Sequence, residues 1–390
     1  CVPKDVAIVI AQLVCYKGSL PQGAPSSPII SNLVCQILDS HLLHIARQYR
    51  MDYTRYADDL TFSTNDKTFL KNSEDFYNAV VREITSSGFE VNTKKTRLVY
   101  KDSRQIVTGL VVNQKINIPK TYYKSTRAML QSYYQTGQYL INGEKGTLNQ
   151  LEGRLSYIYS LEKYNNSVDG EKHTYGNLSS KEKLYRDFLF YRYFLNNSRM
   201  IIVTEGKTDI LYLKAALKKY YLDYPRMITK GKDGSFRYNI SFFRKSERWK
   251  ALFGMSQDGA SGMKTLYNYF VGKNNTDNIL ELFQKKKAAI SKVPVVFLFD
   301  NECKSASGKD KKKKPLQDFV EYTRMSLEQL TTFRNQCCTQ LNQDVNLNLI
   351  TIPLPEGKDQ CEMEDLFTEN TLATEIAGRC FSRTDEDRTK

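Results

Sequence analysis

The sequence predicts a chain of three parts: an α+β part at residues 1–119, a helical part at residues 120–197, and an α/β part at residues 198–390 with a mostly parallel sheet. In the first part, a long amphipathic pattern precedes two short β-rich runs around a tight turn. In the last part, apolar strands alternate with helices, which is typical of parallel sheets. A chain of 390 residues is also too long for one ordinary core, so we expect two or three domains.

The composition favours a nucleic-acid partner. The formal net charge is +14, and Lys and Arg are in excess in both halves of the chain. A basic protein suits a polyanion, because each phosphate that it neutralises releases counterions. The 26 Tyr, several of them beside Lys or Arg, supply faces on which bases stack. No apolar run approaches the roughly 20 residues of a membrane helix, so we expect no membrane partner.

The cysteines indicate a reducing compartment. The chain holds 8 Cys but no C-x-x-C pair. Cys337 and Cys338 are adjacent, which fits neither a common disulfide nor a zinc knuckle. We therefore expect reduced thiols and a cytoplasmic protein.

A proline-rich loop at residues 20–28 leads into the long helix. Its prolines fix φ, and Gly23 allows a ligand to approach the backbone closely. Ser27 is the predicted N-cap, with Pro28 at the first helical position. The apolar residues that follow at helical spacing predict one buried face, and they are Ile29, Ile30, Leu33, Val34, Ile37, Leu38 and Leu42.

Two adjacent carboxylates, Asp58 and Asp59, are predicted at the tip of a tight β-hairpin spanning residues 51–63. At about 4 Å and an effective dielectric near 20, their repulsion is about 4 kcal/mol. A pair of Mg²⁺ ions removes that repulsion and aligns a 3′-hydroxyl with a triphosphate. An isolated Asp-Asp pair is more often an ordinary turn, but this one follows the loop and the helix described above. We therefore interpret both residues as catalytic metal ligands.

The order of P-Q-G loop, long helix and Y-A-D-D hairpin resembles the palm of reverse transcriptases. The loop sequence L-P-Q-G-A-P-S-S-P resembles that of the retron branch of the family. Residues 88–96 are similar to the next palm motif of that family. Residues 107–113 are similar to the V-T-G element of retron enzymes, and residues 151–158 to the helical thumb that grips the template–primer duplex.

This resemblance implies RNA-directed DNA synthesis with Mg²⁺. Its partners would be a cognate noncoding RNA and the branched RNA–DNA hybrid (msDNA) copied from it, primed from a ribose 2′-hydroxyl. By the same resemblance, Gln22, Gly23, Tyr56 and Lys95 border the nucleotide and primer, and Val107, Thr108, Gly109 and Arg154 contact RNA.

The sequence departs from the family pattern at its start. The family takes a third metal-binding aspartate from a strand ahead of the P-Q-G loop, whereas residues 1–19 hold only Asp5, in a segment predicted to be helical. We expect that aspartate and the fingers region upstream of this sequence. The alternative is a non-polymerising RNA/DNA-binding scaffold in which only the C-terminal part is active.

In the last part, acidic clusters follow three predicted strands. Glu205 and Asp209 follow residues 200–204, Asp300 and Glu302 follow residues 293–299, and Glu364 comes after residues 347–354. In a parallel sheet the carboxyl ends of strands meet at one edge, where ligands bind. The clusters therefore predict a cup of carboxylates suited to Mg²⁺ and phosphate oxygens.

The pairing of strand-E-G-x-x-D with strand-D-x-E resembles TOPRIM domains, which are Rossmann-like and occur in topoisomerases, primases and OLD-type nucleases. TOPRIM domains usually show D-x-D, so Glu302 is a departure. The resemblance implies acid–base or ligand work for Glu205, and metal binding by Asp209, Asp300, Glu302 and Glu364. It also implies a Mg²⁺-dependent nuclease effector with its own nucleic-acid substrate, in anti-phage defence. A homo-oligomer is a further candidate partner.

Two further segments each leave two readings open. The glycine-rich residues 254–265 miss the P-loop spacing, and they form either a plain turn or a phosphate cradle. The lysine run at residues 309–314 is either a solvated loop or a phosphate-gripping loop beside the second acidic cluster.

Overall fold

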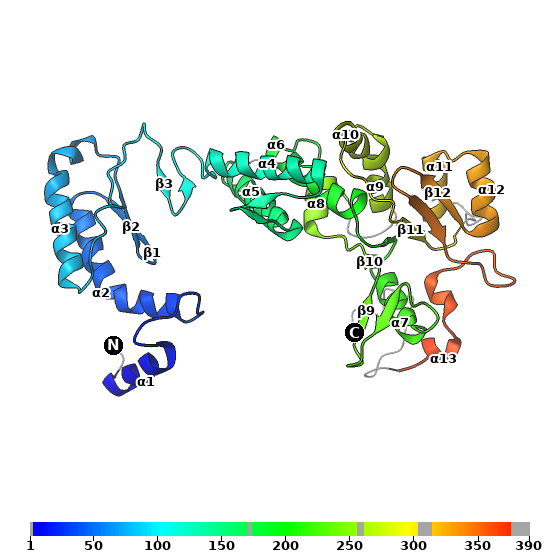
Figure 1. Ribbon diagram of the computed structural model, residues 1–390, viewed down its shortest axis with the longest axis horizontal. Coiled ribbons are helices and arrows are strands. Elements are labelled where there is room, and N and C mark those ends of the chain that lie inside the picture. Colours follow the sequence, from blue (N-terminus) through cyan, green and yellow to red (C-terminus); the bar gives the residue numbers. More distant parts are fainter. Residues whose placement is uncertain (1–2, 171–173, 256–260, 303–313, 376–390) are drawn as a thin grey trace. The chain divides into compact units, whose positions relative to one another are not determined.

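The computed structural model describes residues 3–170, 174–255, 261–302 and 314–375, shown as coloured ribbon in Figure 1. The chain divides into two compact units, residues 1–119 and residues 120–390. The division falls where we placed the end of the palm, whereas the expected thumb and C-terminal domain share one unit.

The first unit is a helix–hairpin–helix arrangement. Its elements are α1 (Lys4–Val14), α2 (Ser27–Gln48), β1 (Asp52–Tyr56), β2 (Asp59–Ser63), the 3-10 helix η1 (Lys67–Asn72), α3 (Ser73–Ser86), β3 (Ile106–Val107) and β4 (Leu110–Val111). The core lies where α2, α3 and the β1–β2 hairpin meet, and it contains Leu38, Leu42, Phe76 and Val80. The predicted long helix and tight hairpin are both present.

Two predictions about α2 are wrong in part. The helix already includes Ser27, whose hydroxyl donates to the carbonyl of Pro21 at 2.8 Å instead of capping the helix. Only Leu38 and Leu42 of the predicted apolar face are buried, because α3 and the hairpin pack only against the C-terminal half. The other half is exposed among the described residues: Ile29, Leu33, Val34 and Ile37 are 60–70% accessible.

By length and apolar composition alone, α2 could also cross a membrane, although core helices of soluble proteins pass the same test. Its charged residue Asp39 bonds Arg55 of the hairpin, and its C-terminal half belongs to the core of the unit. These contacts favour a core helix, and the absence of a membrane partner stays a prediction.

The second unit joins a helical part to a sheet. Its first elements are α4 (Lys120–Thr136), β5 (Leu140–Ile141), β6 (Glu144–Lys145), α5 (Leu148–Val168), α6 (Ser180–Phe190) and the π-helical turn η2 (Tyr191–Leu195). They continue with β7 (Ile201–Thr204), α7 (Asp209–Lys219), β8 (Ile228–Lys230), β9 (Phe236–Tyr238), β10 (Ser241–Phe242), α8 (Glu247–Phe253), α9 (Ser261–Val271) and α10 (Ile279–Lys285). The last are β11 (Val295–Phe299), α11 (Pro315–Thr323), α12 (Leu327–Gln336), β12 (Cys338–Asn342), β13 (Leu347–Thr351), the 3-10 helix η3 (Met363–Leu366) and α13 (Glu369–Leu372).

The sheet has five strands in the order β10-β7-β11-β13-β12. The pairs β10–β7, β7–β11 and β11–β13 are parallel, and β12 is antiparallel to β13. The predicted mostly parallel sheet is therefore confirmed, with β7, β11 and β13 at the three predicted positions. The central strands β7 and β11 are almost entirely buried, as their unbroken apolar sequences require.

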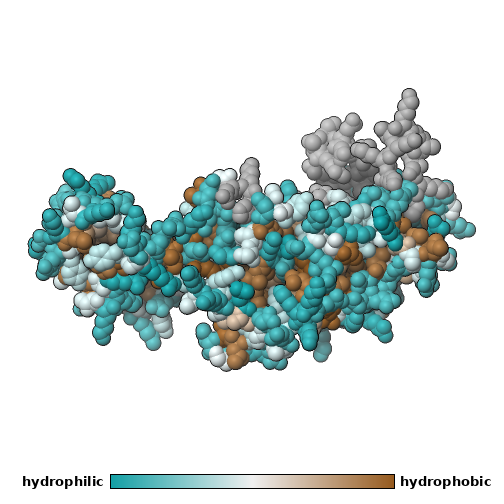
Figure 2. All heavy atoms as spheres, turned by 90° about the horizontal axis from the view of Figure 1, so that it is seen from above, coloured by the Kyte–Doolittle hydropathy of each residue, from teal (hydrophilic) through white to brown (hydrophobic). Residues whose placement is uncertain are grey.

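Aromatic side chains join the helical part to the sheet part. Phe190 packs against Phe270 with ring centroids 4.8 Å apart, and Tyr191 packs against Phe283 at 4.5 Å. Phe194 of η2 contacts the rings of Phe243 and Trp249, and all of these side chains are at most 6% exposed. Hydrophilic residues predominate on the face that Figure 2 shows, with apolar ones scattered among them. One aromatic cluster thus joins α6 and η2 to α8, α9 and α10.

Candidate functional site

The predicted acidic pair lies at the hairpin tip. Tyr56 pairs with Asp59 across the strands, so Ala57 and Asp58 form a two-residue turn. Ala57 has φ 52°, which is uncommon for a residue other than glycine. Both carboxylates are exposed, and neither has a hydrogen-bond or ion-pair partner among the residues that the structure describes. Tyr56, the expected nucleotide neighbour, is 72% exposed beside them.

An ion pair anchors this turn to α2. Arg55 donates from Nε and from Nη2 to the two carboxylate oxygens of Asp39, each at 2.7 Å, and from Nη1 to the carbonyl of Ala57 at 3.0 Å. The hydroxyl of Tyr53 donates to Asp39 at 2.7 Å. The hydrogen bonds from Arg55 hold the pKa of Asp39 below its ordinary value. Sequence reasoning missed this anchor, although an aspartate inside an apolar helix was a signal for it.

The proline-rich loop has the conformation that its sequence requires. Gly23 has φ +86°, and a Cβ added there would meet nothing within 4 Å, so its backbone faces open space. Gln22 is exposed as well. Within the described residues, no hydrogen bond joins this loop to Asp58 or Asp59, so the predicted approach of loop and acids to a common nucleotide stays a prediction.

The remaining predicted contacts of the first unit lie in turns. Lys95 is exposed in a turn, where its backbone N–H donates to the carbonyl of Asn92. Val107 ends β3, and Thr108 and Gly109 link it to β4 with φ of 47° and 84°. Positive φ at both positions is what a type I′ hairpin turn requires, which explains the glycine. The tip is exposed and offers its backbone to a partner.

Arg154 bonds within the protein. Its Nε donates to Thr126 Oγ1 at 2.9 Å, and its Nη2 donates to Ser125 Oγ at 3.0 Å. The guanidinium also lies 3.9 Å from the centroid of the Tyr122 ring. These contacts tie α5 to α4, so the geometry gives Arg154 a structural task. Its contact with RNA stays a prediction.

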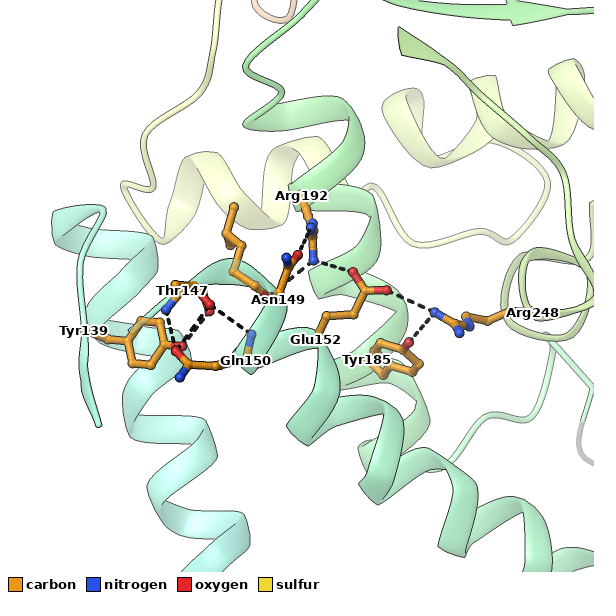
Figure 3. Close-up of polar contacts among 9 residues, drawn as sticks. Tyr139, Thr147, Asn149, Gln150, Glu152, Tyr185, Arg192 and Arg248 are labelled. Carbon is orange, nitrogen blue, oxygen red and sulfur yellow. Dashed lines mark hydrogen bonds and ion pairs between the residues drawn. The ribbon is translucent and has the colours of Figure 1, made fainter. Parts of the chain in front are cut away.

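Two residues before Arg154, Glu152 connects α5 with η2 and α8 (Figure 3). Arg192 donates to Glu152 at 2.5 Å and to Asn149 at 2.7 Å. From the other side, Arg248 donates to Glu152 at 3.0 Å and to the hydroxyl of Tyr185 at 2.8 Å. One carboxylate therefore balances two arginines that come from different elements.

The acidic clusters of the second unit gather at one edge of the sheet. Glu205 directly follows β7, and Asp300 directly follows β11, its parallel neighbour. An antiparallel bridge between Asn301 and Cys361 brings the segment after β13 to the same edge. Glu364 lies in that segment, within η3. The structure thus brings together the three clusters that the sequence placed at strand ends.

The carboxylates of this edge influence one another. Burial raises the pKa of Glu205 to about 7, and the charges of Glu302 and Asp209 add to the effect. Burial likewise raises the pKa of Asp300 to about 7, with the charges of Asp209 and Glu205 contributing. Buried acids that raise one another's pKa in this way form a site where negative charge exceeds positive charge.

Hydrogen bonds and two lysines partly compensate the negative charge at this edge of the sheet. Asp209 begins α7 and accepts the backbone N–H of Gly206 at 2.8 Å. Lys314 Nζ lies 3.0 Å from Glu302 Oε1. Lys245 Nζ donates to the carbonyl of Glu205 at 3.3 Å, and its charge lowers the pKa of that side chain. No local sequence pattern pointed to Lys245, which lies 40 residues from Glu205.

Both acidic sites suit a divalent cation in charge and ligand chemistry, because carboxylate oxygens are the ligands that Mg²⁺ takes in proteins. Neither is a finished metal site: across the described ranges, no three acidic, histidine or cysteine side chains form a set that could hold a metal ion. At the hairpin, Asp58 and Asp59 provide two ligands. At the sheet edge, a metal on Glu302 would compete with Lys314.

The glycine-rich segment and the lysine run, for which the sequence left two interpretations each, lie partly outside the described residues. Residues 256–260 of the glycine-rich stretch and residues 309–313 of the lysine run lie outside. The described remainder of the first begins α9, where Lys264 pairs with Asp318.

Comparison with known proteins bears on the first half of the chain. Residues 11–140 match the family model for reverse transcriptases (RNA-dependent DNA polymerases). The chain is 36% identical to the retron Ec86 reverse transcriptase of Escherichia coli over 158 residues, 40% of this chain and 46% of that protein. It is 43% identical to the retron Mx65 reverse transcriptase of Myxococcus xanthus over 140 residues, 36% of this chain and 31% of that protein. The matches thus span less than half the length of these relatives.

Proposed function

We propose that this chain, whose residues 11–140 form a reverse transcriptase domain of the kind found in retrons, copies part of a structured noncoding RNA into DNA. The observation that supports this proposal most directly is the pair Asp58–Asp59. These carboxylates lie at the tip of an anchored hairpin inside the matched segment, and neither has a partner among the described residues. Bound Mg²⁺ would supply charge neutralisation and in-line alignment of the reacting groups. The two aspartates would hold the metal, and Arg55 would keep their turn in place.

The test is primer extension by the full chain on its cognate RNA with Mg²⁺. We expect the Asp58→Asn/Asp59→Asn protein to lose at least about 100-fold in rate, because it keeps the shape of the turn but not its charge. Asp102→Asn is the matched control, since Asp102 is an exposed aspartate of the same unit. Equal extension by the double variant and the wild type would remove the polymerase assignment and favour the scaffold reading.

We further propose that the sheet edge after β7 and β11 is a TOPRIM-like, Mg²⁺-dependent nuclease site. Support comes from the parallel order of these strands and from the carboxylates that meet there. With its pKa near 7, Glu205 can exchange a proton at neutral pH, as a general acid or base must. Asp209, Asp300, Glu302 and Glu364 are the candidate ligands. A cytoplasmic role in anti-phage defence completes this proposal and rests on the family resemblance.

A nuclease assay with end-labelled DNA and RNA tests the second site. We expect Glu205→Ala to abolish Mg²⁺-dependent cleavage and to leave primer extension intact. Glu281→Ala, at an exposed carboxylate of α10, is the control and should cleave like the wild type. Cleavage that survives in the Glu205 variant would rule out this site.

A further inference from the structure

A cavity of about 390 Å³ lies where α4, α6 and α10 meet. Lys124, Arg127 and Gln131 line it from α4, and Leu184 lines it from α6. Lys286, at the end of α10, closes it from the sheet part of the unit. The cavity therefore belongs to two parts of the chain for which separate activities are proposed above.

Three cations and no acid line the cavity, and apolar side chains such as Leu130 and Leu184 form most of the rest of its wall. Among the described residues, Lys124, Arg127 and Lys286 form no ion pair. The ammonium group of Lys286 lies over two rings, 5.7 Å from the centroid of Tyr134, which lines the cavity, and 5.1 Å from the centroid of Phe283. The nearby acid Asp187 is bonded to Arg186, at 2.8 Å and 3.0 Å. Burial raises the pKa of Asp187, and the charges of Arg186 and Lys286 lower it, so Asp187 shares its charge between these two cations and compensates Lys286 only in part.

The arrangement fits a polyanion better than one small anion. Lys120, Lys124 and Arg127 are spaced i, i+4 and i+7, so they lie on one face of α4 and extend roughly 10 Å along its axis. All three are exposed. A single phosphate could occupy only part of this row, whereas successive phosphates of a strand could pair with each cation in turn.

We propose that Lys124, Arg127 and Lys286 bind the phosphodiester backbone of a nucleic-acid strand, which thereby contacts α4 and α10 at once. The inference rests on the proposed function, and it adds a residue from the C-terminal part to the nucleic-acid surface. A strand held in this cavity links the product of the first site to the domain that carries the second.

The test is a fluorescence anisotropy titration of the full chain with a labelled RNA–DNA hybrid of about 20 base pairs, without Mg²⁺, from about 50 to 200 mM salt. We expect the slope of log affinity against log salt to weaken by roughly 0.9 for Lys286→Gln, and by roughly 2 to 3 for the triple variant Lys124→Gln/Arg127→Gln/Lys286→Gln. Affinity of the triple variant at 150 mM salt should fall at least about tenfold.

Lys285→Gln is the matched control. It removes the same charge from the neighbouring position, but Lys285 is exposed and pairs with Glu281 outside the cavity, so the slope should change by less than roughly 0.3. Thermal melting of each variant checks that it folds.

Three results would overturn the inference: no binding of the hybrid by the wild type, an unchanged slope in the triple variant, or equal loss in the control. Competition by a free deoxynucleoside triphosphate that depends on the same three residues would assign the cavity to a mononucleotide instead. Because this assay involves no DNA synthesis, its failure is distinct from a failure of primer extension.

Discussion

Replacing Asp39 by alanine removes the carboxylate that anchors the acid-bearing hairpin to α2. Asp39 accepts three hydrogen bonds of 2.7 Å, two from Arg55 and one from Tyr53. The side chain of Arg55 is only 8% exposed. The Asp39→Ala change therefore leaves a buried guanidinium without its counter-charge, and the turn that Arg55 supports through the carbonyl of Ala57 loses its brace.

The cost follows from the burial of the pair. Removal of one partner of a buried ion pair costs about 3–5 kcal/mol, and we take the lower end because Asp39 is 30% exposed. Since about 1.4 kcal/mol corresponds to a factor of ten, about 3 kcal/mol makes the open hairpin roughly 150-fold more populated. Asp39→Asn, which keeps the shape but not the charge, should have an intermediate effect.

Hydrogen–deuterium exchange of the full chain measures this opening locally, with peptides from α4 and α5 as the internal reference. Amides of β1 and β2 should exchange faster in Asp39→Ala by about two orders of magnitude, and primer extension should fall with them. Asp102→Ala is the control and should match the wild type. If the hairpin amides of Asp39→Ala exchange within twofold of the wild-type rate, the ion pair does not hold the turn and our reasoning fails.

Two further predictions concern the second unit. Glu152→Gln should lower the free energy of unfolding by about 1–3 kcal/mol and the melting temperature of the full chain by roughly 3–8 °C, because Arg192 and Arg248 share this carboxylate. Glu281→Gln is the control: Glu281 belongs to an exposed ion pair, so the melting temperature should shift by less than about 2 °C. Equal shifts in the two variants would contradict the role of Glu152. The raised pKa of Glu205 and Asp300 means that the folded protein holds more protons than the unfolded one between their ordinary pKa values, near 4, and about 7. Stability in EDTA should therefore fall as the pH rises through that window, and Mg²⁺ should raise the melting temperature by a few degrees more at pH 8 than at pH 5. A melting temperature that Mg²⁺ shifts equally at both pH values, or a Glu205→Gln variant with undiminished pH dependence, would refute this.

Local sequence signals predicted the elements of both units. The hairpin followed from two β-rich runs around Ala57 and Asp58, and β7, β11 and β13 followed from short apolar runs that end in acids. Such signals depend only on neighbouring residues, so one sequence suffices to find them. The shared edge of the acids could also be predicted, because parallel strands end on the same side.

Contacts between distant residues could not be predicted. The bonds of Arg154 to α4 and of Lys245 to Glu205 depend on how helices and loops pack, which no local pattern encodes. The exposed half of α2 was missed for the same reason. Helical spacing shows that a face is apolar, but it does not show whether anything covers it, and Leu33 has the same periodicity as the buried Leu42.

The rings that Phe190, Tyr191 and Phe194 bury against the sheet part have a consequence for how this protein can be divided. A truncation after residue 197 would remove Trp249, Phe270 and Phe283, against which those rings pack, and would leave an exposed apolar surface prone to aggregation. The C-terminal half is thus no detachable module. A junction near residue 119, where the two compact units meet in sequence, would leave this aromatic cluster intact.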